Sequence, residues 1–372
     1  MSLSAYNRVS IDLIALRHNF QLVKKMAGPD TAVLSMVKSD AYGHGLVPAA
    51  ESLSAAGACY FGVASSEEGV LLRRAGIKGT ILVLLGSVEA EPLIDYNLTP
   101  VVFELENIRV LSAAAVRRAA QIGVHLKMDV GMGRLGIMPT ELQAYVREIE
   151  SLPGVYLDGI MAHFPLADTD NQGITMAQDE IFRHQLNELS NGSRGVCHIA
   201  NSAAIIRFAD THHDMVRPGI ALYGYSPLAD SLKPAGLEAV MSFQSRIIQL
   251  KDVPAGYGIS YGHIFKTKVP SRLAVLPLGY ADGYSRSLSG RASVLIRGRR
   301  APVRGRICMN ACVADVTEIP GVETGDDVVI MGRQRCGAAE DEITADEIAS
   351  WMGTINYEVL CLFGSNNKRR YI

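Results

Sequence analysis

The chain has 372 residues, of which 48% are hydrophobic, and a formal net charge of −2. A chain of this length favours two domains with separate cores. Because both signs of charge are scattered along it, we expect no nucleic-acid partner, and no apolar stretch is long enough to span a membrane. The six cysteines form no Cys-x-x-Cys pair and no zinc-type cluster, so we expect no metal site. With no secretion signal at the first residues, reduced thiols in a cytoplasm are the simplest interpretation.

Short β-branched segments alternate with amphipathic segments from residue 32 to about residue 225. The predicted strands are residues 33–37, 61–64, 81–85, 100–103, 124–129, 157–163, 196–199 and 215–216. Helices are predicted between them, for example at residues 47–56, 107–122 and 175–189. Eight strands alternating with helices over roughly 200 residues predict a (β/α)8 barrel. The alternative, a doubly wound open sheet, often carries a Gly-x-Gly-x-x-Gly motif that is missing here.

The pattern changes after about residue 235, where strands and turns dominate. Strands are predicted at residues 241–250, 273–278, 292–296, 307–316 and 327–331, and the only helix at residues 344–352. We therefore predict a barrel domain at residues 1–235 and a mostly β domain at residues 236–372. Residues 9–13 also read as a strand, and we expect residues 1–13 to pair with the β domain.

Lys38 ends the first apolar run of the barrel and precedes a polar turn punctuated by glycine at residues 39–45. In a barrel, the carboxyl ends of the strands carry the functional groups. A partly desolvated lysine at such a place can lose its proton near neutral pH and form an imine with an aldehyde. The pattern therefore indicates a reactive amine.

Basic and hydrogen-bonding residues lie at or just after the carboxyl ends of the other predicted strands. They are Lys127, Asp129 and Arg134, then His163, residues 198–202 and residues 217–220. The loops after the seventh and eighth strands of a barrel commonly bind phosphate, and here they contain Asn201, Ser202, Gly219 and Ile220. A phosphate site beside an amine that reacts with carbonyls indicates pyridoxal 5′-phosphate, which acts as an electron sink.

Eight segments, in order along the chain, closely resemble the motifs of bacterial alanine racemases. The first is residues 37–45 (Val-Lys-Ser-Asp-Ala-Tyr-Gly-His-Gly), which resembles the cofactor-lysine motif of that family. The others are residues 125–134, 198–202, 217–224, 260–262, 279–283, 305–309 and 356–358. The resemblance covers the chain from about residue 7 to about residue 362.

The resemblance implies an isomerase that interconverts L- and D-alanine, for peptidoglycan synthesis or for alanine catabolism. Lys38 would carry pyridoxal 5′-phosphate and act as a base on one face of the substrate. Tyr261 of the partner subunit would serve the opposite face, so that a head-to-tail homodimer shares its active sites. His163 and Arg217 would form a hydrogen-bonded chain to that tyrosine, with Arg217 facing the pyridine nitrogen.

The resemblance also implies roles for the remaining residues of the site. Tyr42, Ser202, Tyr357 and the amides of Gly219 and Ile220 would hold the phosphate, beside Asn201. Arg134 and the amide of Met309 would bind the substrate carboxylate, and Lys127 would be carbamylated. Tyr280, Asp168, Arg286 and Arg306 would form the entrance, with Tyr280 narrowing it to favour a small side chain.

Some features depart from the family pattern or leave alternatives open. Family members commonly carry aspartate where this chain has Asn310, and residues 164–168 and 364–368 also differ. A racemase of serine or another amino acid, or an amino-acid decarboxylase of similar architecture, is the first alternative. Arg217 argues against the decarboxylase, because those enzymes place a carboxylate at the ring nitrogen. Two further alternatives remain. One is a cofactor-binding protein without turnover, and the other is a non-catalytic barrel that binds some other phosphate.

Overall fold

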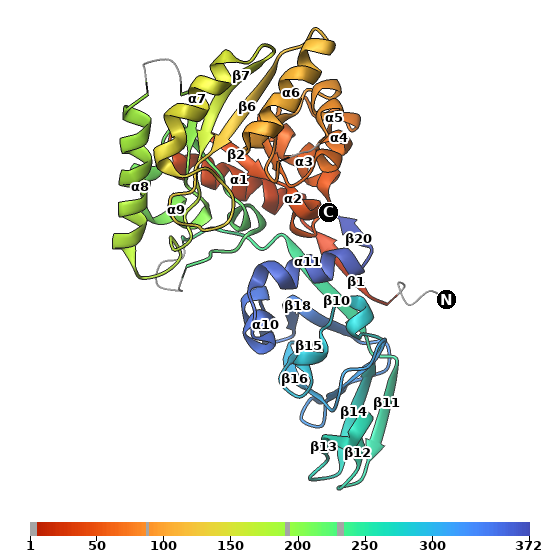
Figure 1. Cartoon of the computed structure of the whole chain (residues 1–372). Helices are drawn as coiled ribbons and strands as arrows, with labels where there is room; N and C mark the ends of the chain where they lie inside the picture. Colours follow the sequence, from red (N-terminus) through yellow and green to blue (C-terminus); the bar gives the residue numbers. More distant parts are fainter. Residues whose placement is uncertain (1–5, 87–88, 190–193, 229–233) are drawn as a thin grey trace. The chain divides into compact units, whose positions relative to one another are not determined.

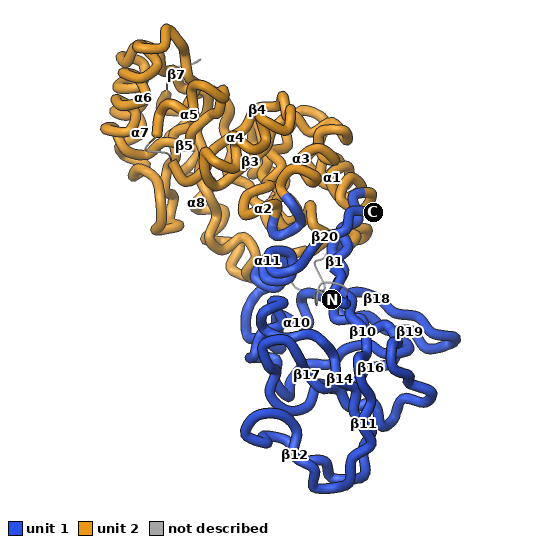
Figure 2. The backbone as a smooth tube through the Cα atoms, turned by 90° about the vertical axis from the view of Figure 1, so that its right-hand side faces the viewer, with its two compact units in different colours: residues 1–13, 42–45, 239–372 blue, residues 14–41, 46–238 orange. Residues whose placement is uncertain are grey.

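The computed structural model describes residues 6–86, 89–189, 194–228 and 234–372. The chain forms two compact units (Figure 2). The barrel unit consists of Ile14–Ala41 and Leu46–Glu238, and the β-rich unit of Met1–Leu13, Tyr42–Gly45 and Ala239–Ile372. The short segment Tyr42–Gly45 thus clusters with the β-rich unit although it directly follows the Lys38 turn.

The barrel unit is built on eight parallel strands in the order β8-β7-β6-β5-β4-β3-β2-β9. They are β2 (Ala32–Met36), β3 (Tyr60–Val63), β4 (Thr80–Val83), β5 (Thr99–Val102), β6 (Ile122–Lys127), β7 (Val155–Met161), β8 (Val196–His198) and β9 (Met215–Val216). An isolated bridge between Asn201 and Arg217 links the two ends of the sheet, so the barrel is nearly closed. The predicted (β/α)8 fold is confirmed.

Helices surround the barrel sheet (Figure 1). They are α1 (Leu13–Ala27), α3 (Leu46–Ala55), α4 (Ser66–Arg74), α5 (Ala90–Asp95), α6 (Leu105–Arg117), α7 (Leu142–Ser151), α8 (Gln172–Asn187) and α9 (Ser202–Arg207). In α6, for example, Ile108, Leu111 and Ala115 are buried on one face, the spacing expected of a surface helix. Because helices cover the strands outside and side chains fill the barrel inside, the strands are buried on both faces.

The β-rich unit contains a 10-stranded sheet and a separate hairpin. The sheet comprises β1 (Arg8–Ile11), β10 (Met241–Arg246), β11 (Gln249–Val253), β14 (Ser271–Leu276), β15 (Ser293–Ile296), β16 (Arg299–Arg304), β17 (Cys312–Asp315), β18 (Asp327–Cys336), β19 (Ala339–Ile343) and β20 (Arg369–Tyr371). The hairpin is β12 (Gly258–Ile259) and β13 (Phe265–Lys266). Strand β1 pairs antiparallel with β10 and parallel with β20.

Three expectations for this unit were wrong in part. The strand expected at residues 241–250 is two strands, β10 and β11, which pair with different neighbours. Besides α10 (Ala345–Met352), the unit contains a second helix, α11 (Asn356–Asn366). Its sequence mixes helix formers such as Leu360 with weaker ones such as Val359 and Gly364, and burial of Val359, Leu360 and Phe363 stabilises the helix. The strand expected at residues 307–316 is shorter, because a turn in which the Cys308 amide donates to the Ala311 carbonyl precedes β17.

Candidate functional site

Arg217, directly after β9, is the most firmly held of the predicted site residues. Its side chain is buried. One guanidinium nitrogen, Nη1, lies 2.9 Å from Nδ1 of His198. The other, Nη2, donates to the carbonyls of Ala162 (2.6 Å) and Ile199 (3.0 Å) and lies 3.1 Å from Nδ1 of His163. A guanidinium has no acceptor, and the two hydrogens of Nη2 are shared among three contacts, so Nδ1 of each histidine faces a donor and the proton of each ring is placed on Nε2.

The charges around Arg217 keep both imidazoles neutral. Burial, followed by the charge of Arg217, holds the pKa of His163 and of His198 well below the ordinary value. Burial also lowers the pKa of Arg217 to about 9, so the guanidinium remains a cation at neutral pH. The chain therefore places one fixed positive charge, with its donors oriented, at this end of the barrel.

Lys127, at the end of β6, lies close to three other cations. Its side chain is only 5% exposed. Burial, then the charges of Arg134, Arg217 and Lys38, lower its pKa to about 8, with Asp129 acting in the opposite direction. Lys38, Lys127, Arg134 and Arg217 thus converge at the strand ends, and such a cluster suits an anionic ligand.

The loop that presents Arg134 is shaped by Asp129. The carboxylate accepts hydrogen bonds from the amides of Gly131 (2.9 Å), Met132 (2.7 Å) and Arg134 (3.1 Å). Burial raises the pKa of Asp129, but these amide bonds outweigh it and lower the pKa overall. Arg134 itself is exposed, so its guanidinium faces solvent at the barrel mouth.

Lys38 begins a left-handed turn, α2 (Lys38–Tyr42). The φ angles of Ser39, Asp40, Ala41 and Tyr42 are 55°, 53°, 54° and 55°. This conformation costs roughly 1–2 kcal/mol for each residue that is not glycine. Hydrogen bonds offset the cost, since the Asp40 carboxylate accepts from the Leu46 amide at 2.7 Å and the Asp40 amide donates to Glu68 at 3.1 Å. Strain of this kind is typical of functional sites.

The structure brings together the two loops expected to bind phosphate. The Ser202 hydroxyl accepts from the amides of Gly219 (2.9 Å) and Ala221 (3.4 Å). The side chain of Asn201 caps α9 by accepting from the Ala204 amide at 3.1 Å. Ser202, Gly219 and Ile220 are all buried. The strand ends of β8 and β9 thus form one small cradle of amides and hydroxyl.

In the β-rich unit, three loops place Tyr261, Tyr280, Arg306 and Met309 near one another. Ser260, which precedes Tyr261, donates through its hydroxyl to the Arg306 carbonyl at 2.6 Å. The Tyr280 amide donates to the Cys308 carbonyl at 3.2 Å, and the following amide to the Met309 carbonyl at 3.0 Å. The side chains of Tyr261 and Met309 are 68% and 56% exposed, which is unusual for residues of their size.

The remaining predicted residues lie as follows. In the β-rich unit, the Tyr42 and Tyr357 rings are 5.9 Å apart between centroids. Burial, and the neighbouring Tyr357, raise the pKa of Tyr42, which therefore stays a neutral hydrogen-bond donor. Arg286 starts a short turn that Ser289 connects to the 305–309 loop. Asp168 is exposed in the loop between β7 and α8 of the barrel unit.

Sequence reasoning missed His125 and Asp158. His125 lies on β6, a strand whose six residues are all buried, and it contacts His198. A histidine within the apolar part of a predicted barrel strand was a signal available in the sequence, because such a polar group needs a partner. Asp158 carries no such signal, since its role depends on a register irregularity between β6 and β7.

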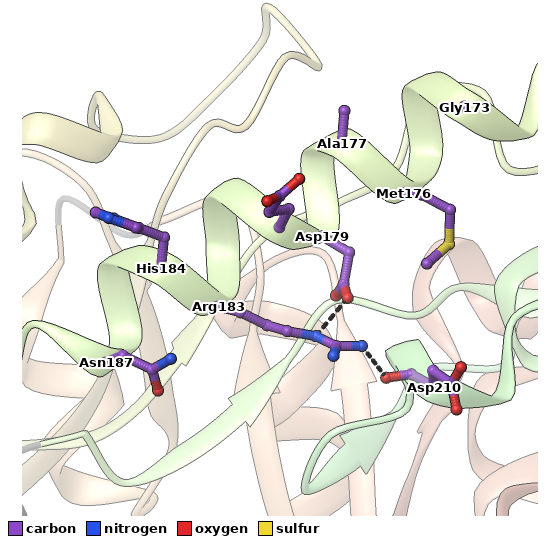
Figure 3. Close-up of a pocket in the computed structure, with 9 residues that line it drawn as sticks. Gly173, Met176, Ala177, Asp179, Arg183, His184, Asn187 and Asp210 are labelled. Carbon is purple, nitrogen blue, oxygen red and sulfur yellow. Dashed lines mark hydrogen bonds and ion pairs between the residues drawn. The ribbon is translucent and has the colours of Figure 1, made fainter.

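A separate groove of about 640 Å³ runs along α8, and none of the predicted residues lines it. Figure 3 shows Arg183 reaching Asp179 and Asp210 across this groove. Asp179 also contacts His213, at 2.8 Å. Its buried carboxylate is thus already paired, and we assign no chemistry to the groove. Within the described ranges, no helix is long and apolar enough to cross a membrane, and no cluster of three or more His, Cys, Asp or Glu suits a metal.

Comparison with known proteins gives a consistent result. Residues 11–227 match the model of the alanine racemase N-terminal domain, and residues 240–371 that of the C-terminal domain. The alanine racemase of Syntrophobacter fumaroxidans is 44% identical over 370 residues, which cover 99% of this chain and 98% of that protein.

Solved structures agree. The alanine racemase of Streptomyces lavendulae has a TM-score of 0.91 at 35% identity, covering 99% of this chain and 97% of the other. That of Bartonella henselae, which contains covalently bound pyridoxal phosphate, has a TM-score of 0.89 at 27% identity, covering 99% of each chain.

Proposed function

The chain belongs to the alanine racemase family and is an isomerase that interconverts L- and D-alanine, and from that premise we propose that it uses pyridoxal 5′-phosphate and two bases from different subunits. The bases are Lys38 and Tyr261 of the partner subunit. The proposal draws most support from the cation cluster of the barrel unit, in which Lys38 and Arg217 lie among groups that suit an anionic cofactor.

The residues present fit this cofactor by their donor chemistry. Lys38 supplies an amine for the aldehyde, and the cradle of Ser202, Gly219 and Ile220 supplies donors for the phosphate. Asn201 caps α9 beside that cradle, and in the proposal Tyr42 and Tyr357 would add phenolic donors to the phosphate. When bound, pyridoxal phosphate supplies an electron sink that stabilises negative charge at the substrate Cα.

Arg217 favours racemisation over other reactions of the same cofactor class. Because a guanidinium only donates, Arg217 beside the pyridine nitrogen would keep that nitrogen unprotonated and so make the cofactor a weaker electron sink. Negative charge at the substrate Cα would then be short-lived, which would favour return of the proton over transamination or decarboxylation. The two carbonyls and two imidazoles around Arg217 keep its donors directed.

Inversion needs a proton carrier on each face of the substrate. Lys38 Nζ would remove or return the proton on one face, and Tyr261 Oη on the other. His163 accepts from Arg217 through Nδ1, so its Nε2–H can donate to the Tyr261 oxygen of the partner. Arg134 and the Met309 amide would hold the substrate carboxylate, and a carbamylated Lys127 would hold Arg134.

A homodimer would complete the site. Tyr261, Tyr280 and Met309 are exposed on the β-rich unit, together with Tyr257 and Ile264. A partner subunit that covers this surface would bury large apolar side chains and bring Tyr261 to the other subunit's Lys38. Tyr280, Asp168, Arg286 and Arg306 would then form the entrance.

The cell compartment and the physiological role follow from the same proposal. None of the six cysteines forms a disulfide, as suits a reducing cytoplasm. There the product D-alanine would enter peptidoglycan synthesis, or the reverse reaction would serve alanine catabolism.

Deuterium exchange at Cα tests the proposed chemistry. The purified protein is incubated with L- or D-alanine in D2O, and the label and the enantiomer ratio are followed together. We expect exchange from both enantiomers, no carbon dioxide release, and dependence on added pyridoxal phosphate after the protein has been stripped. Exchange accompanied by carbon dioxide would indicate a decarboxylase, and cofactor binding without exchange would indicate a protein without turnover.

A further inference from the structure

A line of four side chains runs from the proposed cofactor site through the barrel wall. Arg217 contacts Nδ1 of His198 at 2.9 Å. Nε2 of His198 lies 2.7 Å from Nδ1 of His125. Nε2 of His125 lies 3.7 Å from a carboxylate oxygen of Asp158, slightly beyond a direct hydrogen bond. Both histidines are buried, whereas the Asp158 side chain is 40% exposed.

Because Arg217 carries only donors, it determines which ring nitrogen of each histidine in this line holds the proton. Arg217 can only donate, so Nδ1 of His198 accepts and the proton of His198 is on Nε2. That proton is donated to Nδ1 of His125, which places the proton of His125 on Nε2 as well. This last N–H faces Asp158, and the approach of His125 lowers the pKa of that carboxyl, so it is an anion at neutral pH. Both imidazoles are neutral, and the N–H group of each ring points away from Arg217 and toward Asp158.

Local backbone features make room for the line. The register between β6 and β7 shifts at His125, which pairs with Gly159 while Val124 pairs with Leu157. Asp158 is therefore an extra residue, and such bulges redirect side chains near functional sites. A Cβ at position 159 would lie 2.5 Å from the His125 ring, so glycine is required beside it.

We propose that His125 and Asp158 are positioning residues for racemisation: they hold His198 as a hydrogen-bond acceptor and thereby keep Arg217 charged and directed at the cofactor ring. This inference rests on the proposed role of Arg217. The line couples a buried cation to a carboxylate near solvent through two neutral rings, which offsets part of the cost of burying that cation.

Without Asp158, the outer end of the line no longer favours the Nε2–H form of His125, and the proton order depends on Arg217 alone. If His125 carried its proton on Nδ1, it would face the N–H of His198, and His198 would have to move its own proton to Nδ1. Two donors would then meet at Arg217, and the guanidinium would lose one of its fixed contacts. We therefore expect a loss in kcat rather than in alanine binding, because Arg217 does not hold the substrate.

The tautomers of His125 and His198 test the line independently of catalysis. Two-bond ¹H–¹⁵N spectra of the holoenzyme labelled with ¹⁵N-histidine report which ring nitrogen carries the proton, and the His125→Gln variant assigns its signal. The proposal requires a neutral Nε2–H ring at both positions. An imidazolium or an Nδ1–H ring at His125 would overturn it. A second measurement separates the proton order from the role of Arg217. If both histidines carry their proton on Nε2 but Arg217→Lys racemises alanine at the normal rate, the proton order is correct and the proposed role of Arg217 is wrong.

Kinetics of matched variants test the positioning role. Asp158→Asn should lower kcat by up to about tenfold, because a neutral amide attracts the His125 N–H less strongly than a carboxylate does, with KM for alanine nearly unchanged. Glu148→Gln is the control, because it breaks an ion pair with Arg109 of similar exposure, away from the line. At the buried position, His125→Gln keeps an acceptor and a donor, whereas His125→Phe keeps only bulk.

The glutamine variant should retain more activity than the phenylalanine variant. Equal rates in these two variants, or equal kcat in Asp158→Asn and Glu148→Gln, would show that the ring and carboxylate only fill space. Should His125→Phe fail to fold, the Asp158 comparison still decides, because that side chain lies partly in solvent.

Discussion

Burial of Lys127 costs folding free energy and at the same time makes its amine more reactive near neutral pH. Its pKa is lowered from 10.5 to about 8 by burial and by the neighbouring cations. Below pH 8 the folded protein must keep the amine charged, at a cost on the order of 3 kcal/mol. Between pH 8 and 10.5 only the unfolded chain holds this proton, so stability rises with pH over that window. A neutral amine near pH 8 is also the form that reacts with carbon dioxide.

Bicarbonate should therefore stabilise the protein through Lys127. The neutral amine attacks carbon dioxide and loses a proton, so that an anionic carbamate replaces one of the clustered positive charges. At pH 8, adding bicarbonate to protein prepared without carbon dioxide should raise the Tm by about 2–4 °C for each kcal/mol gained. Thermal unfolding of the wild type and of Lys127→Met, which has no amine to modify, measures the difference. An equal rise in both proteins would contradict carbamylation of this residue.

Tyr261 offers a second test at the scale of one residue. Tyr261→Phe removes the proposed proton carrier on one face and leaves Lys38 on the other. Racemisation should fall about 10³-fold, within the range for a lost acid or base, while deuterium exchange persists for one enantiomer. Tyr60→Phe is the control and should keep normal rates, because Tyr60 starts β3 and so lies at the end of the parallel strands away from Lys38. Equal losses of exchange from L- and D-alanine would argue against two bases.

At the scale of elements, the packing of β6 against β7 decides where the buried histidines can lie. Gly159 has no side chain because the His125 ring and the Val196 carbonyl occupy that space. Strand β7 therefore has a bulge at Asp158 and a glycine at position 159, where a β-branched side chain would ordinarily strengthen the strand. The turn after β2 is a second segment with an unfavourable local conformation. Its left-handed backbone is strained, and the hydrogen bond from the Leu46 amide to the Asp40 carboxylate offsets part of that cost.

Gly159→Ala should destabilise the barrel unit. The added methyl must displace the His125 ring or the facing backbone, at a cost of about 1–3 kcal/mol. On α8, Gly173→Ala meets no atom closer than 3.9 Å, so it should be neutral or stabilise by up to about 1 kcal/mol. Urea unfolding of the two variants gives both values. A Gly159→Ala protein as stable as the wild type would mean that the His125 site is loosely packed.

At the scale of the whole molecule, each active site should need two chains. A Lys38→Ala subunit and a Tyr261→Phe subunit are each inactive with themselves. In a mixed dimer, however, one site receives both intact residues and the other receives both defects. Random mixing makes half of the dimers mixed, so about a quarter of the wild-type activity should return. The rate after mixing and re-equilibration checks this, with each variant alone as the control; no recovery from correctly formed mixed dimers would place both bases in one chain.

The sequence by itself determined the barrel and the chemistry-bearing residues. Strand and helix periods are local, so they were readable over most of the barrel unit. Lys38, Arg134, His163 and Arg217 stood out because they follow predicted strands, and parallel strands bring their carboxyl ends to one face. The family resemblance then supplied roles that no single spacing could, including that of Tyr261 on the β-rich unit.

Only the tertiary structure decided the features that depend on contacts between distant segments. The helix α11, whose local propensities are mixed, forms because its apolar face is buried. The left-handed turn occurs at residues other than glycine because surrounding hydrogen bonds hold it. His125 and Asp158 meet only because β7 contains one residue more than β6 opposite them. A one-residue shift in register leaves no trace in local sequence periodicity, and yet it determines which carboxylate stands behind Arg217.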